Sequence, residues 1–510
     1  MLKAIQRFLT IIFLIAGTLF FLYQGLLYVR SRSLMPQGMT IAGVDVSGLT
    51  REEAADLLYA QYMAPLIVYH REERAELPPE EVGFQLDMDA MFGRAEEWRA
   101  QQDFWKGFLG FLIGRSLEPV QIELNATHDR ESLLHWLQTY SSFLDEPAKP
   151  PQLLGDSDVF REGAPGFVTD IEASLPAVEA ALYRPNDREA HLVIEDQEAP
   201  RLDMTLLEAN IRNQLAAFDG LGSVFIMDLE TGDELSINAD VAMSGLSIVK
   251  IPILLEVYRA IDFAPTPDQT KLISETAILS GDFSANLLLD VVAGQNNAYL
   301  GADILTESMH RLGLVNTFIV TPYEEPNRAG RTTLATPANS RTDISTFPDP
   351  AMQTTAEDMG TLLSMIYHCS HGQGALLAVY PDQLTAEECQ AILDVLVLNT
   401  EGNLIRYGVP EEVRVSHKHG WAGNTHGDAG IVFSPGGDYV IVEYLTQPNS
   451  DWLVIDVSFP ILREISRAAY NYFNVNQPNL ENPADRAARE AAAREAAEAA
   501  ESAGTDSQGQ

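Results

Sequence analysis

Apolar residues form one long run near the start of the chain, from Phe8 to Val29, interrupted only by threonines, a glutamine and glycines. A helix of this length crosses about 30 Å of hydrocarbon. The run exceeds the apolar region of a secretory signal peptide, and no small-x-small cleavage site follows it. We therefore expect residues 1–35 to hold a cytoplasmic stub, one uncleaved transmembrane helix and a linker. Basic residues flank the run almost evenly, so charge orients it only weakly.

The region after this run alternates between short strand-like and helical patterns. A capping box at Thr50 opens the first helical pattern. A Gly-Phe-x-x-Asp motif that ends at Asp87 recurs in a second motif that ends at Asp170, and each precedes a helical pattern. The recurrence predicts a small duplicated α+β region over 36–203, with repeats at about 36–120 and 121–203.

In the second half of the chain, strands bracket a helical middle. Strand-like patterns begin at Ser223 and Glu234 around a hairpin turn, and two more begin at Ala429 and Tyr439. We expect an α+β domain over 204–475, with an antiparallel sheet and a helical subdomain.

The last part of the chain, residues 476–510, is rich in alanine and glutamate. It carries no apolar stripe that a helix would bury. This composition predicts a disordered tail, or at most a solvated helix.

Charge and cysteine content narrow the function classes. The formal net charge of −40 excludes nucleic acid as a partner, because phosphates would be repelled along most of the surface. Cys369 and Cys389 both lie in helical patterns, and we expect two buried thiols rather than a disulfide. The histidines His417, His419 and His426 have no carboxylate or cysteine at a ligand spacing, so neither a metal ion nor a cofactor is expected.

Ser247 and Lys250 form the first chemical motif, Ser-Ile-Val-Lys, at the predicted start of an apolar helix. Positions i and i+3 of a helix share a face, so the hydroxyl and the ammonium can meet. The free N–H groups at a helix start favour an oxyanion on an acyl group held by the serine. A lysine that accepts the serine proton near neutral pH needs burial or a second cation nearby.

Two further segments carry candidate chemistry. Lys418 lies at the end of a strand-like pattern and is followed by His419 and Gly420, which would place a cation at a strand edge. Ser280-Gly-Asp282 precedes an apolar helix. Ser284-x-Asn286 is an alternative assignment for the same motif. A helix with alanine, asparagine and three leucines usually contributes only to the core.

In this order, the three segments resemble the motifs Ser-x-x-Lys, Ser-Asp-Asn and Lys-Thr-Gly of class A β-lactamases and low-molecular-weight penicillin-binding proteins. The resemblance covers about 206–473 and implies a β-lactamase or DD-peptidase fold that acts on a β-lactam or a peptidoglycan stem peptide. It implies the following roles: Ser247 as nucleophile, Lys250 as general base, Ser280 as proton relay, Lys418 as cation for a substrate carboxylate, the backbone N–H groups of Ser247 and Trp421 as oxyanion hole, Asp282, His419 and Gly420 as substrate contacts, and Asn286 as a structural residue.

Three departures from the family pattern bear on activity. The middle motif has Asp282 where asparagine is usual, and His419 replaces a threonine that helps to hold the substrate carboxylate. Residues 324–354 contain no Glu-x-x-Leu-Asn motif. Glu324 or Glu325 remains as a candidate base for deacylation.

Residues Ala42 to Thr50, together with the Gly-Phe-x-x-Asp motifs, resemble the peptidoglycan-binding domain found beside vancomycin-resistance W-type proteins. This resemblance implies a module that faces the cell wall. The combined expectation is a single-pass membrane protein with an extracytoplasmic serine hydrolase. The alternative is a catalytically weak or inert scaffold that binds the cell wall.

Overall fold

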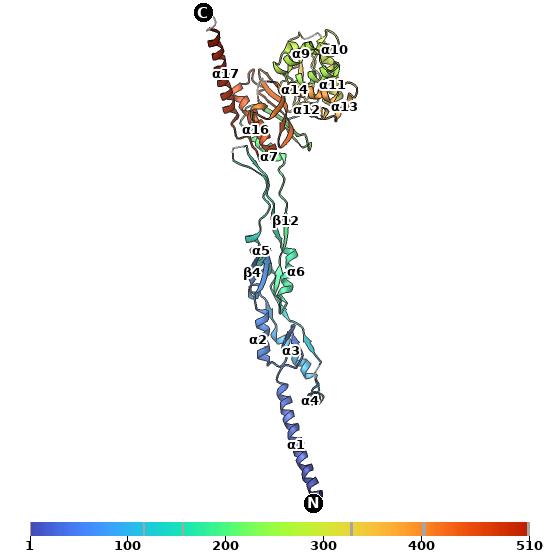
Figure 1. Ribbon diagram of the computed structural model, residues 1–510, viewed down its shortest axis with the longest axis vertical. Coiled ribbons are helices and arrows are strands. Elements are labelled where there is room, and N and C mark those ends of the chain that lie inside the picture. Colours follow the sequence, from blue (N-terminus) through green and yellow to red (C-terminus); the bar gives the residue numbers. More distant parts are fainter. Residues whose placement is uncertain (1, 116–117, 156–157, 327–329, 400–403, 507–510) are drawn as a thin grey trace. The chain divides into compact units, whose positions relative to one another are not determined.

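The computed structural model describes residues 2–115, 118–155, 158–326, 330–399 and 404–506 (Figure 1). The chain forms two compact units. The first comprises Met1–Lys149 and Ala164–Pro200, and the second comprises Pro150–Gly163 and Arg201–Gln510. Each unit has its own hydrophobic core.

The first unit begins with the helix α1 (Leu2–Ser31), which is long and apolar enough to cross a membrane. Short strands and helices follow it. They are β1 (Met39–Ile41), β2 (Val44–Asp45), α2 (Arg51–Tyr62), β3 (Leu66–His70), β4 (Glu73–Leu77), the 3-10 helix η1 (Pro79–Val82), β5 (Gln85–Leu86), α3 (Met88–Ala100), α4 (Phe104–Leu112), β6 (Val120–Ile122), β7 (Ala126–Thr127), α5 (Arg130–Leu144), β10 (Gly166–Asp170), α6 (Ile171–Leu182), β11 (Glu189–His191) and β12 (Val193–Gln197).

The capping box predicted at Thr50 is confirmed. Thr50 caps α2, and Glu53 completes the capping box. Asp87 and Asp170 cap α3 and α6 in the same way, since each accepts a hydrogen bond from the backbone N–H three residues later. The two Gly-Phe-x-x-Asp motifs therefore have the same local role, while the duplication of the whole region stays a prediction.

The second unit contains the remaining elements. They are β8 (Gln152–Leu153), β9 (Phe160–Arg161), α7 (Met204–Leu215), β13 (Leu221–Asp228), β14 (Glu234–Ile237), β15 (Met243–Ser244), α8 (Lys250–Ala260), α9 (Pro267–Ile278), α10 (Asp282–Ala293), α11 (Ala298–Arg311), β16 (Phe318–Ile319), β17 (Met352–Thr354), α12 (Ala356–Ser370), α13 (Ala375–Val379), α14 (Ala386–Val397), α15 (Ile405–Gly408), β18 (Arg414–Ala422), β19 (Thr425–Ser434), β20 (Gly437–Thr446), α16 (Ile455–Phe473) and α17 (Pro483–Asp506).

An antiparallel sheet of order β14-β13-β20-β19-β18 forms the centre of the second unit. Helices α8, α12 and α14 contribute to the core on one face, while α7 and α16 cover the other. Side chains alternate between the faces along each strand, so both faces of this sheet are apolar. The mixture of an antiparallel sheet with a helical region agrees with the predicted α+β class.

Residues 150–163 fold with the second unit although the sequence places them within the predicted 36–203 region. Phe160 is buried in the core beside α7 and α16. Asp158, next to it, accepts hydrogen bonds from the side chains of Asn210 and Arg467. These contacts attach the β8-β9 hairpin to the second unit.

One expectation about the second unit is corrected by the structure. Cys369 and Cys389 form a disulfide, because α12 and α14 pack together and bring the two Cα atoms within 5.8 Å. Of the two alternatives for the tail, disorder or a solvated helix, the structure has a helix, α17, over Pro483–Asp506. Its first turns are attached to the domain, since Arg486 is buried and donates to the Val409 carbonyl at 2.6 Å.

Candidate active site

Ser247 lies in a turn between β15 and α8, and its side chain is partly exposed. The preceding residue, Leu246, has a left-handed φ of 54°, which is costly for a side chain of this size. Lys250 begins α8 and is fully buried. Its Nζ atom donates a hydrogen bond to Ser247 Oγ at 2.7 Å. The contact expected from the i and i+3 spacing is therefore present.

Ser280, two residues before α10, lies beside the same Lys250 ammonium. Lys250 Nζ lies 2.8 Å from the Ser280 carbonyl oxygen and 3.4 Å from Ser280 Oγ. Ser280, like Leu246, is held at a left-handed φ, here 56°. The alternative assignment is not brought to the site, because Ser284 is buried and bonds to Thr276 and to the Gly281 carbonyl.

Asp282, the first residue of α10, forms an ion pair of 2.6 Å with Lys250. Its carboxylate also lies at the positive end of the α10 dipole. A carboxylate here stabilises the charged ammonium and so opposes the loss of the proton that Lys250 must give up before it can act as a base. The neutral asparagine usual at this position would oppose that loss far less.

The edge strand β18 lies directly against the serine. A Cβ atom at Gly420 would lie 2.7 Å from the Leu246 Cβ and 2.8 Å from the Ser247 backbone nitrogen, so only glycine allows this approach. Lys418 precedes Gly420 by two residues, so its side chain projects from the face of the sheet on which a Gly420 side chain would lie. It lies within β18 rather than at its end, is fully buried, and donates to the His419 carbonyl at 2.9 Å. Trp421 follows and is 55% exposed.

His419 lies on the opposite face of β18, because side chains alternate along a strand. Its ring packs near Phe459 of α16, with 6.5 Å between the ring centroids. Burial lowers the pKa of His419 to about 4, so the ring is neutral near pH 7. The structure does not bring this side chain to Ser247.

Further ionisable groups occupy that far face. His417 Nδ1 lies 2.9 Å from Asp428 Oδ1, and both side chains are buried. Asp428 pairs in register with Glu443 on the neighbouring strand. Burial, with a contribution from the Asp428 charge, raises the pKa of Glu443 well above its ordinary value. Among the described residues, neither Glu443 carboxyl oxygen has a hydrogen-bond partner.

Tyr323 belongs to the site, although no motif in the sequence indicates it. Its hydroxyl donates to the carbonyl of the strained Leu246 at 2.7 Å, and its ring lies 4.5 Å from Lys250 Nζ in a cation–π contact. Burial raises the pKa of Tyr323 well above its ordinary value, which keeps the hydroxyl protonated as a donor. No spacing rule identifies it, because it lies in a long loop that only the folded chain brings to α8.

Asn286 bonds to the backbone of this loop. Its side chain accepts from the Tyr323 N–H at 3.0 Å and donates to the Tyr323 carbonyl at 2.7 Å. Glu324 and Glu325, the candidate bases, are exposed. Burial raises the pKa of Asp290 in α10, and the Glu325 charge adds to this rise. Residues 327–329, which follow these glutamates, lie outside the described residues.

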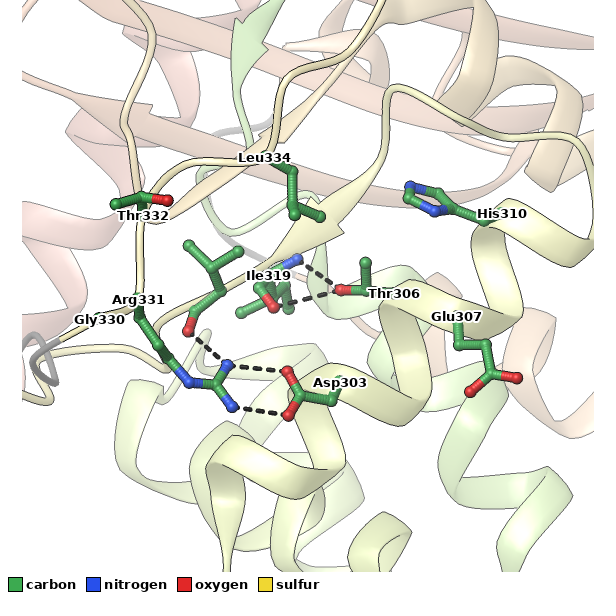
Figure 2. Close-up of a pocket in the computed structure, with 10 residues that line it drawn as sticks. Asp303, Thr306, Glu307, His310, Ile319, Gly330, Arg331, Thr332 and Leu334 are labelled. Carbon is green, nitrogen blue, oxygen red and sulfur yellow. Dashed lines mark hydrogen bonds and ion pairs between the residues drawn. The ribbon is translucent and has the colours of Figure 1, made fainter.

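A pocket of about 520 Å³ is lined by residues of α11, of β16 and of the loop that follows β16 (Figure 2). Arg331 closes one side, where its guanidinium forms a two-pronged ion pair with Asp303 and also donates to the Val320 carbonyl. Thr306 bonds to both backbone polar groups of Ile319. These contacts attach Ile319 of β16, and Arg331 within the loop that follows β16, to α11. Ser247 and Lys250 are not among the residues that line the pocket.

The chain matches the model of one protein family. The family model described as the beta-lactamase enzyme family matches residues 206–266 and 265–473. No curated protein sequence matches the chain.

Solved structures with a similar arrangement include a mutant of PBP-A as an acyl-enzyme complex with penicillin G. It is 20% identical and covers 54% of this chain and 98% of its own, with a TM-score of 0.41. A beta-lactamase from Sphaerobacter thermophilus is 18% identical and covers 55% and 100%, with a TM-score of 0.41. A beta-lactamase from Xanthomonas campestris pv. campestris is 16% identical and covers 52% and 97%, with a TM-score of 0.39.

Proposed function

Because the chain belongs to the beta-lactamase enzyme family, we propose that residues 204–475 form an acyl-serine hydrolase of the class A type. Its substrates are amides that carry a nearby carboxylate, either a β-lactam or a D-alanyl stem peptide of peptidoglycan. The observation that carries the proposal is the 2.7 Å hydrogen bond between Lys250 Nζ and Ser247 Oγ. An activated serine needs a base at this distance.

In the proposed reaction, Ser247 Oγ attacks the substrate carbonyl carbon while its proton passes to Lys250. The backbone N–H groups of Ser247 and Trp421 stabilise the negative oxygen, an interaction worth about 10² to 10³ in rate for each donor. The C–N bond then breaks, Ser280 relays a proton to the leaving nitrogen, and an ester forms on Ser247. Hydrolysis of this ester by water returns the free serine.

The positions of the other residues support their proposed roles. Lys418 supplies positive charge toward the substrate carboxylate from the face of β18 that meets Ser247. Gly420 permits the close contact between β18 and the serine turn. Tyr323 and Asn286 act as positioning residues, because they act through Leu246 and the loop rather than on substrate.

Covalent labelling by a fluorescent penicillin tests the proposal. The full chain is expected to be labelled, and Ser247→Ala is expected to abolish the label. Ser284→Ala is the matched control, because it removes the serine of the alternative assignment without touching Lys250. Equal labelling of Ser247→Ala and the unmodified chain would remove Ser247 from the nucleophile role.

The alternative is a catalytically weak or inert scaffold, and one observation favours it. The ion pair between Asp282 and Lys250 stabilises the charged form of the base and therefore slows proton transfer. Absence of any penicillin label on the folded, unmodified chain would favour the scaffold over the hydrolase.

The proposed location is the cell membrane, with α1 as a single-pass anchor and the hydrolase outside the cytoplasm. The length and apolar character of α1 support the anchor. The disulfide between Cys369 and Cys389 supports an oxidising compartment, where such bonds persist.

For the first unit we propose contact with the cell wall, on the family resemblance of its motifs. Sedimentation with isolated peptidoglycan sacculi tests this. A variant that lacks 36–149 and 164–200 keeps the hairpin required by the second unit. It is expected to retain penicillin labelling and to lose sedimentation, whereas unchanged sedimentation would exclude the wall-binding role of the first unit.

A further inference from the structure

The helix α4 exposes an unusually apolar surface for a segment outside the core. Trp105 is 70% exposed, Leu109 is 60% exposed, and Ile113, which ends the helix, is 76% exposed. These residues follow one another at a spacing of four and therefore form one stripe. A continuous stripe of large apolar side chains on a surface marks contact with a partner or a membrane.

Another side of α4 packs on α1. The Tyr28 ring lies 5.3 Å from the Phe104 ring, 5.5 Å from the Phe108 ring and 5.4 Å from the Phe111 ring, measured between centroids. Gly107 is required for this approach, because a Cβ atom there would overlap the Tyr28 hydroxyl. The large apolar side chains of α4 thus divide into a phenylalanine set that contacts Tyr28 of α1 and the exposed stripe of Trp105, Leu109 and Ile113.

The contacts with α1 fix the depth of α4 in a bilayer. Tyr28 precedes the basic residues Arg30 and Arg32, which mark the end of the apolar run. Phe108 also reaches Phe21, with 6.2 Å between the ring centroids. Phe21 lies seven residues before Tyr28, which is about 10 Å along a helix. A bilayer that encloses α1 therefore also meets the first turns of α4.

The composition of α4 agrees with this depth. Tryptophan and other aromatic residues are enriched where the hydrocarbon meets the headgroups. Lys106 and Arg115 are exposed and supply charges for the headgroup level. Helices that lie in this interface bury their apolar face by about 5–10 Å.

We infer that α4 is a second membrane contact, an interfacial helix whose Trp105, Leu109 and Ile113 side chains enter the leaflet from which the C-terminal end of α1 emerges. The inference rests on the proposed anchoring by α1. Two attachment points restrict the rotation of the first unit about α1, which a single helix alone would leave free.

Depth-dependent fluorescence quenching tests this inference with the full chain in nanodiscs of phosphatidylethanolamine and phosphatidylglycerol. The two native cysteines form a disulfide, so an introduced cysteine is the reactive thiol. Leu109→Cys carries the probe, and Ile113→Cys repeats the measurement at a second position. Leu14→Cys, within α1, reports anchoring. Phe143→Cys is the matched control, because this residue of α5 is 81% exposed and apolar.

A lipid spin-labelled near its headgroup is expected to reduce emission at Leu109 and Ile113 by about half, at the shallow depth typical of interfacial helices. A lipid labelled near its chain end is expected to quench Leu14, and neither lipid should quench Phe143. Quenching at Leu14 without quenching at Leu109 and Ile113 would overturn the inference while the anchor stands. Absence of quenching at all three positions would overturn the anchor as well.

Discussion

The ammonium of Lys250 and the carboxylate of Asp282 form a 2.6 Å ion pair beside Ser247. The same ammonium bonds to the serine hydroxyl, so the proposed base is shared between the group it must activate and a group that keeps it charged. This arrangement predicts an enzyme whose acylation step is slow at neutral pH and becomes faster as pH rises.

Replacing that carboxylate is expected to accelerate acylation. Asp282→Asn removes the negative charge and keeps the shape of the side chain, so Lys250 loses its proton more easily. We expect the acylation rate by penicillin at pH 7 to rise roughly tenfold, which corresponds to about 1.4 kcal/mol. The rise of rate with pH should also move to lower pH. Asp290→Asn, on the same helix, is the control, and equal pH profiles for Asp282→Asn and the unmodified chain would contradict the account.

Removal of the Tyr323 hydroxyl is expected to impair positioning of the serine turn. Tyr323→Phe keeps the ring over Lys250 but leaves the Leu246 carbonyl without this donor. We expect a loss of about 1 kcal/mol in unfolding free energy. The rate of acylation should fall while its pH profile is unchanged. Tyr367→Phe removes a comparable hydroxyl contact, to Asp438, far along α12. Loss of rate in both variants to the same extent would indicate a general effect on stability.

The buried Glu443 is expected to make the hydrolase domain less stable as pH rises. Its folded-state pKa is raised above the ordinary value of 4.5, so the folded chain keeps a proton that the unfolded chain loses above that value. Stability from this group is therefore complete below about pH 4.5 and declines at higher pH. Glu443→Gln should have a higher melting temperature than the unmodified chain at pH 8 and a similar one near pH 4. The exposed Glu412→Gln is the control, and parallel melting curves across pH would contradict the prediction.

Turnover of a chromogenic cephalosporin is expected to show a burst followed by slow hydrolysis. Residues 324–354 lack the Glu-x-x-Leu-Asn motif, and the two glutamates of this segment, Glu324 and Glu325, are exposed. General-base assistance is worth about 10² to 10⁴ in rate, so its loss would be plain in the steady state. Rapid linear turnover would contradict this expectation. Loss of that turnover in Glu324→Gln or Glu325→Gln would then identify the base, and if neither mattered, Lys250 itself would activate the water.

The sequence alone predicts those parts of the site that depend on local spacing. Ser247 and Lys250 meet because i and i+3 share a helix face, and the capping box of α2 follows from the residues at its start. The family resemblance implies Gly420 only as a substrate contact, and the sequence does not reveal that its backbone lies against Ser247.

Features that depend on tertiary contact could not be predicted in this way. Tyr323 reaches Leu246 only because Asn286 holds the loop. Whether Cys369 and Cys389 bond depends on the packing of α12 against α14, which no periodicity encodes. The orientation of His419 follows from the alternation of β18 once the face of Gly420 is known.

Peptide mapping by mass spectrometry after incubation with benzylpenicillin reports directly whether Ser247 is the acylated residue. One penicilloyl group is expected for each chain, attached to the peptide that contains Ser247 and linked through its side-chain oxygen. A penicilloyl group on a different residue, or a folded chain that carries none after prolonged incubation, would contradict the proposal that Ser247 is the acylated nucleophile.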